Sequence, residues 1–244
     1  MKAEVSSQQS VGNGDGRFAD GGFQIIPNLI SDSECNLLES ELSALFENQQ
    51  KSAKNKIGGV RNLLRGSLRV SETAASAKLV SRLKDFLGRN VFPVRAIFFD
   101  KTSEANWLVP WHQDLAIAVN ERIETPGFTG WSIKDETMHV HPPREILEGM
   151  ITLRLHLDDC RADNGALKII PGSHLHGKLS AVQITEWTSK QIAFTCEVPK
   201  DGGLFMRPLL LHSSASARNP SHRRVLHIEY ATQELPNGLK WFDR

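Results

Sequence analysis

The sequence predicts a mainly β protein with flanking helices, in which the strands form a sandwich or jelly roll. Seven short runs of β-like composition follow one another after residue 92, and turns such as Asp163-Asn164-Gly165 separate them. No helical pattern lies between these runs, and strands in that arrangement pack as two layers. The seven runs are residues 94–99, 112–119, 150–157, 166–170, 191–198, 203–211 and 224–230.

The residues before the β region predict a short strand and two helices. The strand is expected over residues 23–26. Ser31 is a suitable N-cap for the first helix, and Glu34 three residues later completes a capping box. The second helix is expected over residues 74–87, and a surface loop over residues 51–59 precedes it. The apolar stripe of the first helix consists of Cys35, Leu38, Leu42 and Leu45.

The chain is expected to hold one domain. Residues 1–17 are polar and glycine-rich, which predicts a disordered N-terminal segment. Residues 18–244 form the predicted single domain, a size that buries a core without disulfides. Within it, residues 120–149 lack periodicity and are too long for an ordinary connection, so an insertion or lid is expected there.

Composition argues against a polyanionic partner. Lys and Arg number 29 and Asp and Glu number 28, so the net charge is +1 and no global field attracts nucleic acid or an acidic membrane. The three cysteines are widely spaced without a CxxC pair, which indicates a reduced, cytoplasmic setting. No apolar run approaches the ~20 residues that span a bilayer, and the N-terminus lacks the apolar stretch of a secretory signal. We expect a small-molecule partner.

The triplet His112-Gln113-Asp114 is the first candidate for chemistry. Residues two apart on a strand point to the same face, so His112 and Asp114 present a nitrogen and an oxygen to one point. His212, at the end of the apolar run 203–211, would complete two histidines and one carboxylate, a set typical of non-haem Fe(II) oxygenases. An HxD triplet also arises by chance, and a histidine at a strand end is often only a polar rim residue.

Arg223 lies eleven residues after His212. A dicarboxylate cosubstrate needs one end on the metal and the other on a fixed cation, and arginine pairs with a carboxylate bidentately. Ser214 would add a hydroxyl donor. Strand alternation alone would leave Arg224 as the alternative, because it shares a face with Leu226.

Four segments together resemble the phytanoyl-CoA dioxygenase (PhyH) family. They cover roughly residues 92–232 in the family's order, and they are Val109-Pro110-Trp111-His112-Gln113-Asp114, Leu155-His156-Leu157-Asp158-Asp159, Asn164-Gly165-Ala166-Leu167 leading to Pro171-Gly172-Ser173-His174, and Leu211-His212-Ser213-Ser214 with Arg223-Arg224. The resemblance implies a double-stranded β-helix, the jelly-roll barrel of cupin-like proteins. It also implies iron at His112, Asp114 and His212, and 2-oxoglutarate held by Arg223 and Ser214.

The implied activity is that of an Fe(II)/2-oxoglutarate-dependent dioxygenase. It would use O₂ to hydroxylate a small-molecule metabolite and form succinate and CO₂. Related halogenases replace the carboxylate ligand with a small residue, so Asp114 favours hydroxylation or another oxidation. Two alternatives stay open: a cupin-like metal enzyme that does not use 2-oxoglutarate, and a non-catalytic metabolite-binding barrel.

Other polar residues are weaker candidates for the same pocket. Arg95 shares a strand face with Ile97 and Phe99, and an anion such as 2-oxoglutarate or substrate would be its partner if it is buried. The candidates for substrate binding are Thr152, Arg154, His156, Trp111 and Arg61. His139 and His141 are lid residues or a second metal site, and His174 is expected to be structural.

Overall fold

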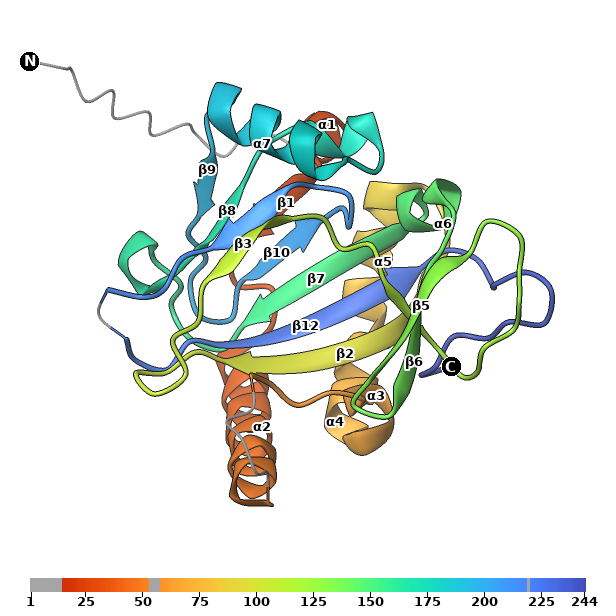
Figure 1. Cartoon of the computed structure of the whole chain (residues 1–244). Coiled ribbons are helices and arrows are strands. Elements are labelled where there is room, and N and C mark those ends of the chain that lie inside the picture. The colour runs from red at the N-terminus through yellow and green to blue at the C-terminus, as the bar shows by residue number, and fades with distance from the viewer. Residues whose placement is uncertain (1–14, 53–57, 219) are drawn as a thin grey trace, which may run out of the picture.

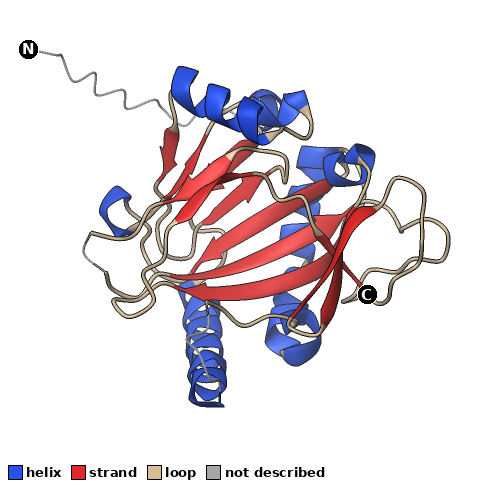
Figure 2. Cartoon of the chain, in the orientation of Figure 1, coloured by secondary structure: helices blue, strands red, loops and turns tan. Residues whose placement is uncertain are grey.

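The computed structural model describes residues 15–52, 58–218 and 220–244, and its centre is a pair of facing antiparallel sheets with most of the helices on the outer side of the larger sheet (Figures 1 and 2). This arrangement confirms the predicted jelly roll. None of the helices in the described ranges is long and apolar enough to cross a membrane.

The larger sheet has the strand order β1-β10-β7-β12-β2. Its neighbouring strands are all antiparallel, and the long central strands β7 and β12 pair over seven residues of each. Its strands are β1 (Phe23–Ile26), β10 (Gly203–Met206), β7 (Met150–His156), β12 (Arg224–Ala231) and β2 (Phe92–Asp100).

The smaller sheet lies opposite it, with the order β3-β11-β8-β9. Its strands are short: β3 (Val109–His112), β11 (His212–Ser214), β8 (Leu167–Ile169) and β9 (Phe194–Cys196). Apolar side chains such as Leu204 of β10 and Ile169 of β8 fill the space between the two sheets at one end. The other end holds the polar residues of the candidate site.

Residues 120–149 contain a hairpin and a short helix. The hairpin strands β5 and β6 join β4, just before this segment, in a third sheet with the order β4-β6-β5, and the helix follows. The elements are β4 (Ile117–Val119), β5 (Thr129–Lys134), β6 (Thr137–His141) and α6 (Arg144–Glu148). In Figure 1 the hairpin β5–β6 stands beside one end of β2 and β12.

The N-terminal helices cover the outer face of the larger sheet. The helix expected over residues 74–87 begins three residues later, at Ala77, and ends before Gly88 (φ 64°), as expected; Ala74 ends the preceding helix. The N-terminal helix α1 begins at Asp15, within the segment 1–17 for which disorder was expected. Residues 1–14, and 53–57 of the loop expected at 51–59, lie outside the described residues. The helices are α1 (Asp15–Gly21), α2 (Asp32–Ser52), α3 (Leu63–Gly66), α4 (Leu68–Ala74), α5 (Ala77–Leu87) and, on the far side, α7 (Ala181–Lys190).

Strand β7 shows how alternation divides the two faces of the larger sheet. Ile151, Leu153 and Leu155 belong to the core that packs against α2 and α5. Thr152, Arg154 and His156 therefore point toward the interior between the sheets, and all three are buried. The predicted orientation of this strand is confirmed.

Two predicted strands are each interrupted, and both interruptions lie at the candidate metal ligands. The run 112–119 is not one strand, since β3 ends at His112 and β4 begins at Ile117. The run 203–211 breaks after Met206 at Arg207-Pro208, where proline cannot donate to a ladder. The backbone N–H of Asp114 donates to the carbonyl of Pro208 (2.9 Å), so a hydrogen bond joins the two interrupted segments.

Candidate active site

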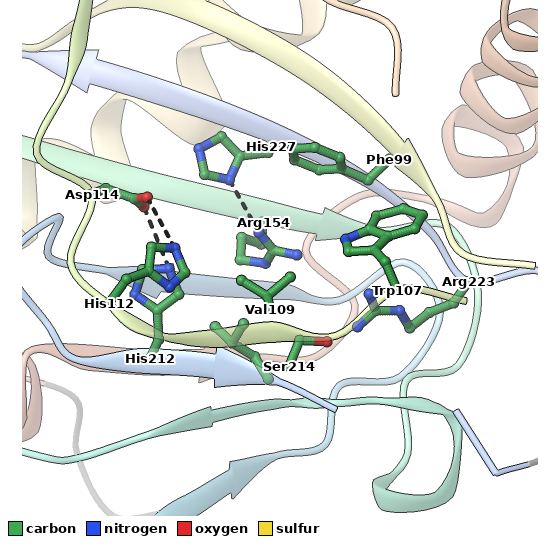
Figure 3. Close-up of a pocket in the computed structure, with 11 residues that line it drawn as sticks. Phe99, Trp107, Val109, His112, Asp114, Arg154, His212, Ser214, Arg223 and His227 are labelled. Carbon is green, nitrogen blue, oxygen red and sulfur yellow. Dashed lines mark hydrogen bonds and ion pairs between the residues drawn. The ribbon is translucent and has the colours of Figure 1, made fainter. Parts of the chain in front are cut away.

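The three predicted metal ligands meet at the ends of two paired strands. His112 is the last residue of β3 and faces His212, the first residue of β11, in direct register. Asp114 lies two residues beyond β3, and its carboxylate oxygens are each 3.7 Å from Nε2 of one histidine. One ligand atom from each residue lies within 4.8 Å of the others. Figure 3 shows the three side chains converging on one point.

Backbone carbonyls fix the tautomer of both histidines. Nδ1 of His112 donates to the carbonyl of Pro110 (2.8 Å), and Nδ1 of His212 donates to the carbonyl of Leu210 (2.9 Å). A carbonyl only accepts, so each Nδ1 carries the proton and each Nε2 keeps a lone pair. These two lone pairs point toward Asp114, which is the orientation that a metal site requires.

The electrostatics of the three residues suit a bound cation. Burial lowers the pKa of His212 to about 4, and His112 beside it acts in the same direction, so the imidazole is neutral near pH 7. Burial by itself raises the pKa of the Asp114 carboxyl, yet the neighbouring imidazoles of His212, His227 and His112 hold it below its ordinary value. One carboxylate oxygen of Asp114 is buried without a hydrogen-bond partner. A divalent metal would satisfy that oxygen and both nitrogens.

Within the described ranges, no second metal cluster accompanies the triad. Across the described parts of the chain, His112, Asp114 and His212 are the one group of three metal-ligating residues close enough to share an ion. His139 and His141 therefore lack the further ligands that a second site would need.

A cavity of about 130 Å³ extends from the triad to Arg223 and Ser214 (Figure 3). Arg223 is 4% exposed and donates to the carbonyl of Gly165 (2.5 Å). Arg224 lies on the opposite face, where it contacts both oxygens of Asp158 (2.8 and 2.6 Å). The geometry thus favours Arg223 over Arg224 as the cation that would bind a carboxylate in this cavity. Burial alone did not decide between them, because β12 is covered on both faces and its inner face is polar.

Two further cations lie in or behind this cavity: Lys101, which the sequence did not indicate, and Arg154, which was a candidate for substrate binding. Nζ of Lys101 donates to Oγ of Ser214 (3.0 Å) and to the carbonyl of Ala215 (2.8 Å). Arg154 lines the cavity and contacts Nδ1 of His227 (3.2 Å). Burial and the nearby guanidinium of Arg223 lower the pKa of Lys101 to about 8 and that of Arg154 to about 10.

This cluster of cations lacks a compensating anion of its own. Asp114, at the metal end, is the one carboxylate among the residues that line the cavity. Buried cations without a counter-ion are unstable, so the cavity is suited to a ligand with two negative charges. The remaining walls are apolar or aromatic, with Phe99, Trp107 and Val109 among them.

Comparison with known proteins identifies the family. The model of the phytanoyl-CoA dioxygenase (PhyH) family matches residues 18–225. The chain belongs to the PhyH family. With the family and the His-Asp-His triad established, this PhyH member is a non-haem iron, 2-oxoglutarate-dependent oxygenase. No curated protein matches the chain in sequence.

Solved structures share the PhyH fold at low sequence identity. AviO1 from Streptomyces viridochromogenes is 19% identical, with a TM-score of 0.66 over 91% of this chain and 94% of that chain. EctD from S. alaskensis, solved with 2-oxoglutarate and 5-hydroxyectoine, is 16% identical, with a TM-score of 0.68 over 88% and 74%. The carbocyclase SnoK from nogalamycin biosynthesis is 13% identical, with a TM-score of 0.69 over 89% and 82%.

The weaker candidates of this PhyH member lie in different places. Arg95 and Arg61 line a second cavity beside the triad, together with His139 and His141. Arg95 contacts Glu229 there (3.1 Å) and does not line the first cavity. Its position therefore does not favour a role in binding 2-oxoglutarate.

Three other candidates do not line either cavity beside the triad. Trp111 packs against Leu211 and Leu179 on the other side of its strand. Thr152 and His156 are buried inside, and neither ring nitrogen of His156 has a hydrogen-bond partner. Nε2 of His174 donates to the carbonyl of Ala19 (3.2 Å) and its ring lies against Gly22, a structural position.

Proposed function

We propose that this PhyH member is an Fe(II)/2-oxoglutarate-dependent dioxygenase that hydroxylates a small organic molecule and releases succinate and CO₂. The observation that carries the proposal is the alignment, in one cavity, of the His112–Asp114–His212 triad with Arg223 and Ser214 at the other end. A metal alone would explain the triad, whereas the distant cation calls for a ligand that bridges the two.

The proposed iron ligands are Nε2 of His112, Nε2 of His212 and a carboxylate oxygen of Asp114. Three protein ligands on one side leave the other coordination positions for cosubstrate and O₂. When bound, iron and 2-oxoglutarate supply the oxidation, in which one oxygen atom of O₂ enters succinate and the other enters the substrate. Asp114 keeps the carboxylate position filled, which favours hydroxylation over halogenation.

The proposed role of Arg223 is to hold the far carboxylate of 2-oxoglutarate. Its guanidinium is fixed by the carbonyl of Gly165, so it is positioned before the ligand arrives. Ser214 lies beside it, and its Oγ is oriented by Lys101. Arg154 adds positive charge midway along the cavity. These residues bind and orient the cosubstrate, and no general base is needed.

The substrate is proposed to enter through the second cavity, of about 450 Å³, because His112 and Asp114 also line that space. Its volume suits a small metabolite. Lys134, His139 and His141 of the hairpin β5–β6 form part of its wall, so the segment 120–149 would cover the bound substrate and exclude water.

Oxygen uptake and succinate formation test the proposal. Purified protein with Fe(II) should consume O₂ and form succinate only when 2-oxoglutarate is present, slowly without substrate. Oxygen uptake that is independent of 2-oxoglutarate would favour the cupin-like metal enzyme. No succinate under any condition, with iron bound, would favour a non-catalytic barrel.

A further inference from the structure

The second cavity beside the triad is cationic at the side away from the metal ligands. Three cations line it, Arg61, Arg95 and Lys134, against two carboxylates, Asp114 and Glu229. Since Asp114 belongs to the metal site, the rest of the wall carries an excess of positive charge.

Glu229 is neutralised inside the wall. Its Oε1 accepts from Nη1 of Arg95 (3.1 Å) and from Nε2 of His227 (3.3 Å). The side chains of Arg95 and Glu229 are only 13% and 9% exposed, so this pair is shielded from solvent. The buried ion pair therefore removes one cation and one anion, and leaves Arg61 and Lys134.

The two remaining cations are weakly compensated. Nε of Arg61 contacts Asp135 (2.5 Å), but that carboxylate is 68% exposed at the tip of the β5–β6 hairpin, where water screens the pair. Lys134 has no carboxylate within ion-pair distance in the part of the chain that the structure describes.

The imidazole of His139 lies within the electrostatic influence of Arg61, Arg95 and Lys134. It is 2% exposed, and its Nδ1 donates to the carbonyl of Thr137 (2.9 Å). Burial lowers the pKa of His139, and Arg95, Lys134 and Arg61 lower it further. The imidazole stays neutral near pH 7, so it neither adds to nor cancels the positive charge around it.

The wall nearer the triad is apolar. Ile97 and Phe99 of β2 share a face with Arg95, and Leu115 and Ala116 follow Asp114 along the chain. Ile97 is in register with His227, and Arg95 lies two residues further on, which is about 7 Å along a strand. A ligand in this cavity would thus place an apolar portion beside the metal ligands and a polar end near the cations.

We infer that the substrate of this enzyme is a small organic anion, whose carboxylate or phosphate end contacts Lys134 and Arg61 and whose apolar part meets the metal site. The inference rests on the proposed function, and it deepens it by naming the substrate class. A neutral or cationic substrate would give these two cations of the cavity wall no anionic partner.

Binding of matched six-carbon probes tests the inference. Hexanoate, hexyl phosphate, hexanamide and hexylammonium are titrated anaerobically into the protein loaded with Fe(II) and saturating 2-oxoglutarate. The absorption band of the iron–2-oxoglutarate complex reports binding next to the metal, and calorimetry reports binding independently. Hexanoate or hexyl phosphate should bind at least about tenfold more tightly than hexanamide, because one charge-assisted hydrogen bond strengthens binding by about that factor.

Lys134→Met and Arg61→Met should each weaken binding of the preferred anion about tenfold and leave that of hexanamide the same. Lys168→Met is the matched control, because Lys168 is an exposed strand lysine of the smaller sheet, and it should change neither. The stronger of the two anions identifies carboxylate or phosphate as the recognised group.

Equal binding of the anions and hexanamide, preference for hexylammonium, or no binding of any anion by calorimetry would overturn the inference. Failure of the proposed function has a different signature, since the absorption band would then not form with Fe(II) and 2-oxoglutarate alone, before any probe is added.

Discussion

Arg223, just before β12, and Arg224, its first residue, offer the sharpest contrast in the molecule, because their side chains point to opposite faces of the sheet. Arg223→Met should weaken 2-oxoglutarate binding while leaving iron binding intact. A bidentate guanidinium–carboxylate contact comprises two hydrogen bonds to a charged group, at about 1.5–3 kcal/mol each. The loss of about 3–6 kcal/mol corresponds to a rise in Kd of about 10²- to 10⁴-fold. Arg223→Lys retains the charge without the fork, so its effect should be smaller.

Arg224→Met is the matched control for this experiment. Arg224 contacts Asp158 (2.6 Å) and Glu39 (2.7 Å) toward α2. Its removal leaves the partly buried carboxylate of Asp158 without its cation, whereas Glu39 keeps its contact with Lys200 (3.1 Å). We expect a loss of about 2–4 kcal/mol in the free energy of unfolding, seen as a lower Tm, with an unchanged Kd for 2-oxoglutarate. Anaerobic titration of the Fe(II) protein measures the Kd for 2-oxoglutarate, and thermal unfolding measures the Tm. If Arg224→Met weakens cosubstrate binding and Arg223→Met does not, the assignment of the two faces is refuted.

Three further predictions concern buried polar residues. His212→Ala should abolish stoichiometric Fe(II) binding, measured by metal analysis after desalting, and full retention of iron would remove His212 from the ligand set. Gln113→Leu should lower the free energy of unfolding by about 2–4 kcal/mol, because the buried amide bonds to the carbonyls of Gly177 and Leu209 (both 2.7 Å) and to the N–H of Leu179 (2.8 Å). His156→Leu should instead stabilise the protein by about 1–3 kcal/mol, because both ring nitrogens are buried without partners. Burial holds the pKa of His156 well below 6.5, so below pH 6.5 only the unfolded chain takes up this proton and stability falls with decreasing pH. That part of the slope, at most about 1.4 kcal/mol per pH unit, should disappear in His156→Leu, and an unchanged slope in denaturant titrations at pH 5–7 would contradict the account.

Much of the fold followed from local pattern. The alternation on β7 placed its apolar residues against the helices, and the polar ones on the inside, as observed. The boundaries failed where the chain satisfies its backbone by tertiary contacts. Asp114 donates its N–H to the carbonyl of Pro208, and the side chain of Gln113 makes three hydrogen bonds to two loop segments, so β3 stops at His112. No window of sequence contains both partners of those contacts.

The three metal ligands of the candidate site could be predicted from the sequence, but the number of buried cations beside them could not. His112, Asp114 and His212 followed from residue type and from the family resemblance, and the structure brings them together. Lys101 looks like an ordinary lysine in the sequence, because its burial depends on how the end of β2 is covered. Arg154 was predicted as a candidate for substrate binding, and it lines the cavity that reaches Arg223. His156 lies on an expected strand, whereas Trp111 lies just before the expected strand 112–119, and neither side chain lines a cavity beside the triad.

Anomalous diffraction from anaerobic crystals soaked with Fe(II) and 2-oxoglutarate tests the central claim most directly. We predict one iron peak about 2.0–2.2 Å from Nε2 of His112, Nε2 of His212 and an oxygen of Asp114, with the far carboxylate of 2-oxoglutarate on the guanidinium of Arg223. An iron peak elsewhere, or a cosubstrate that reaches the metal without touching Arg223, would contradict the account.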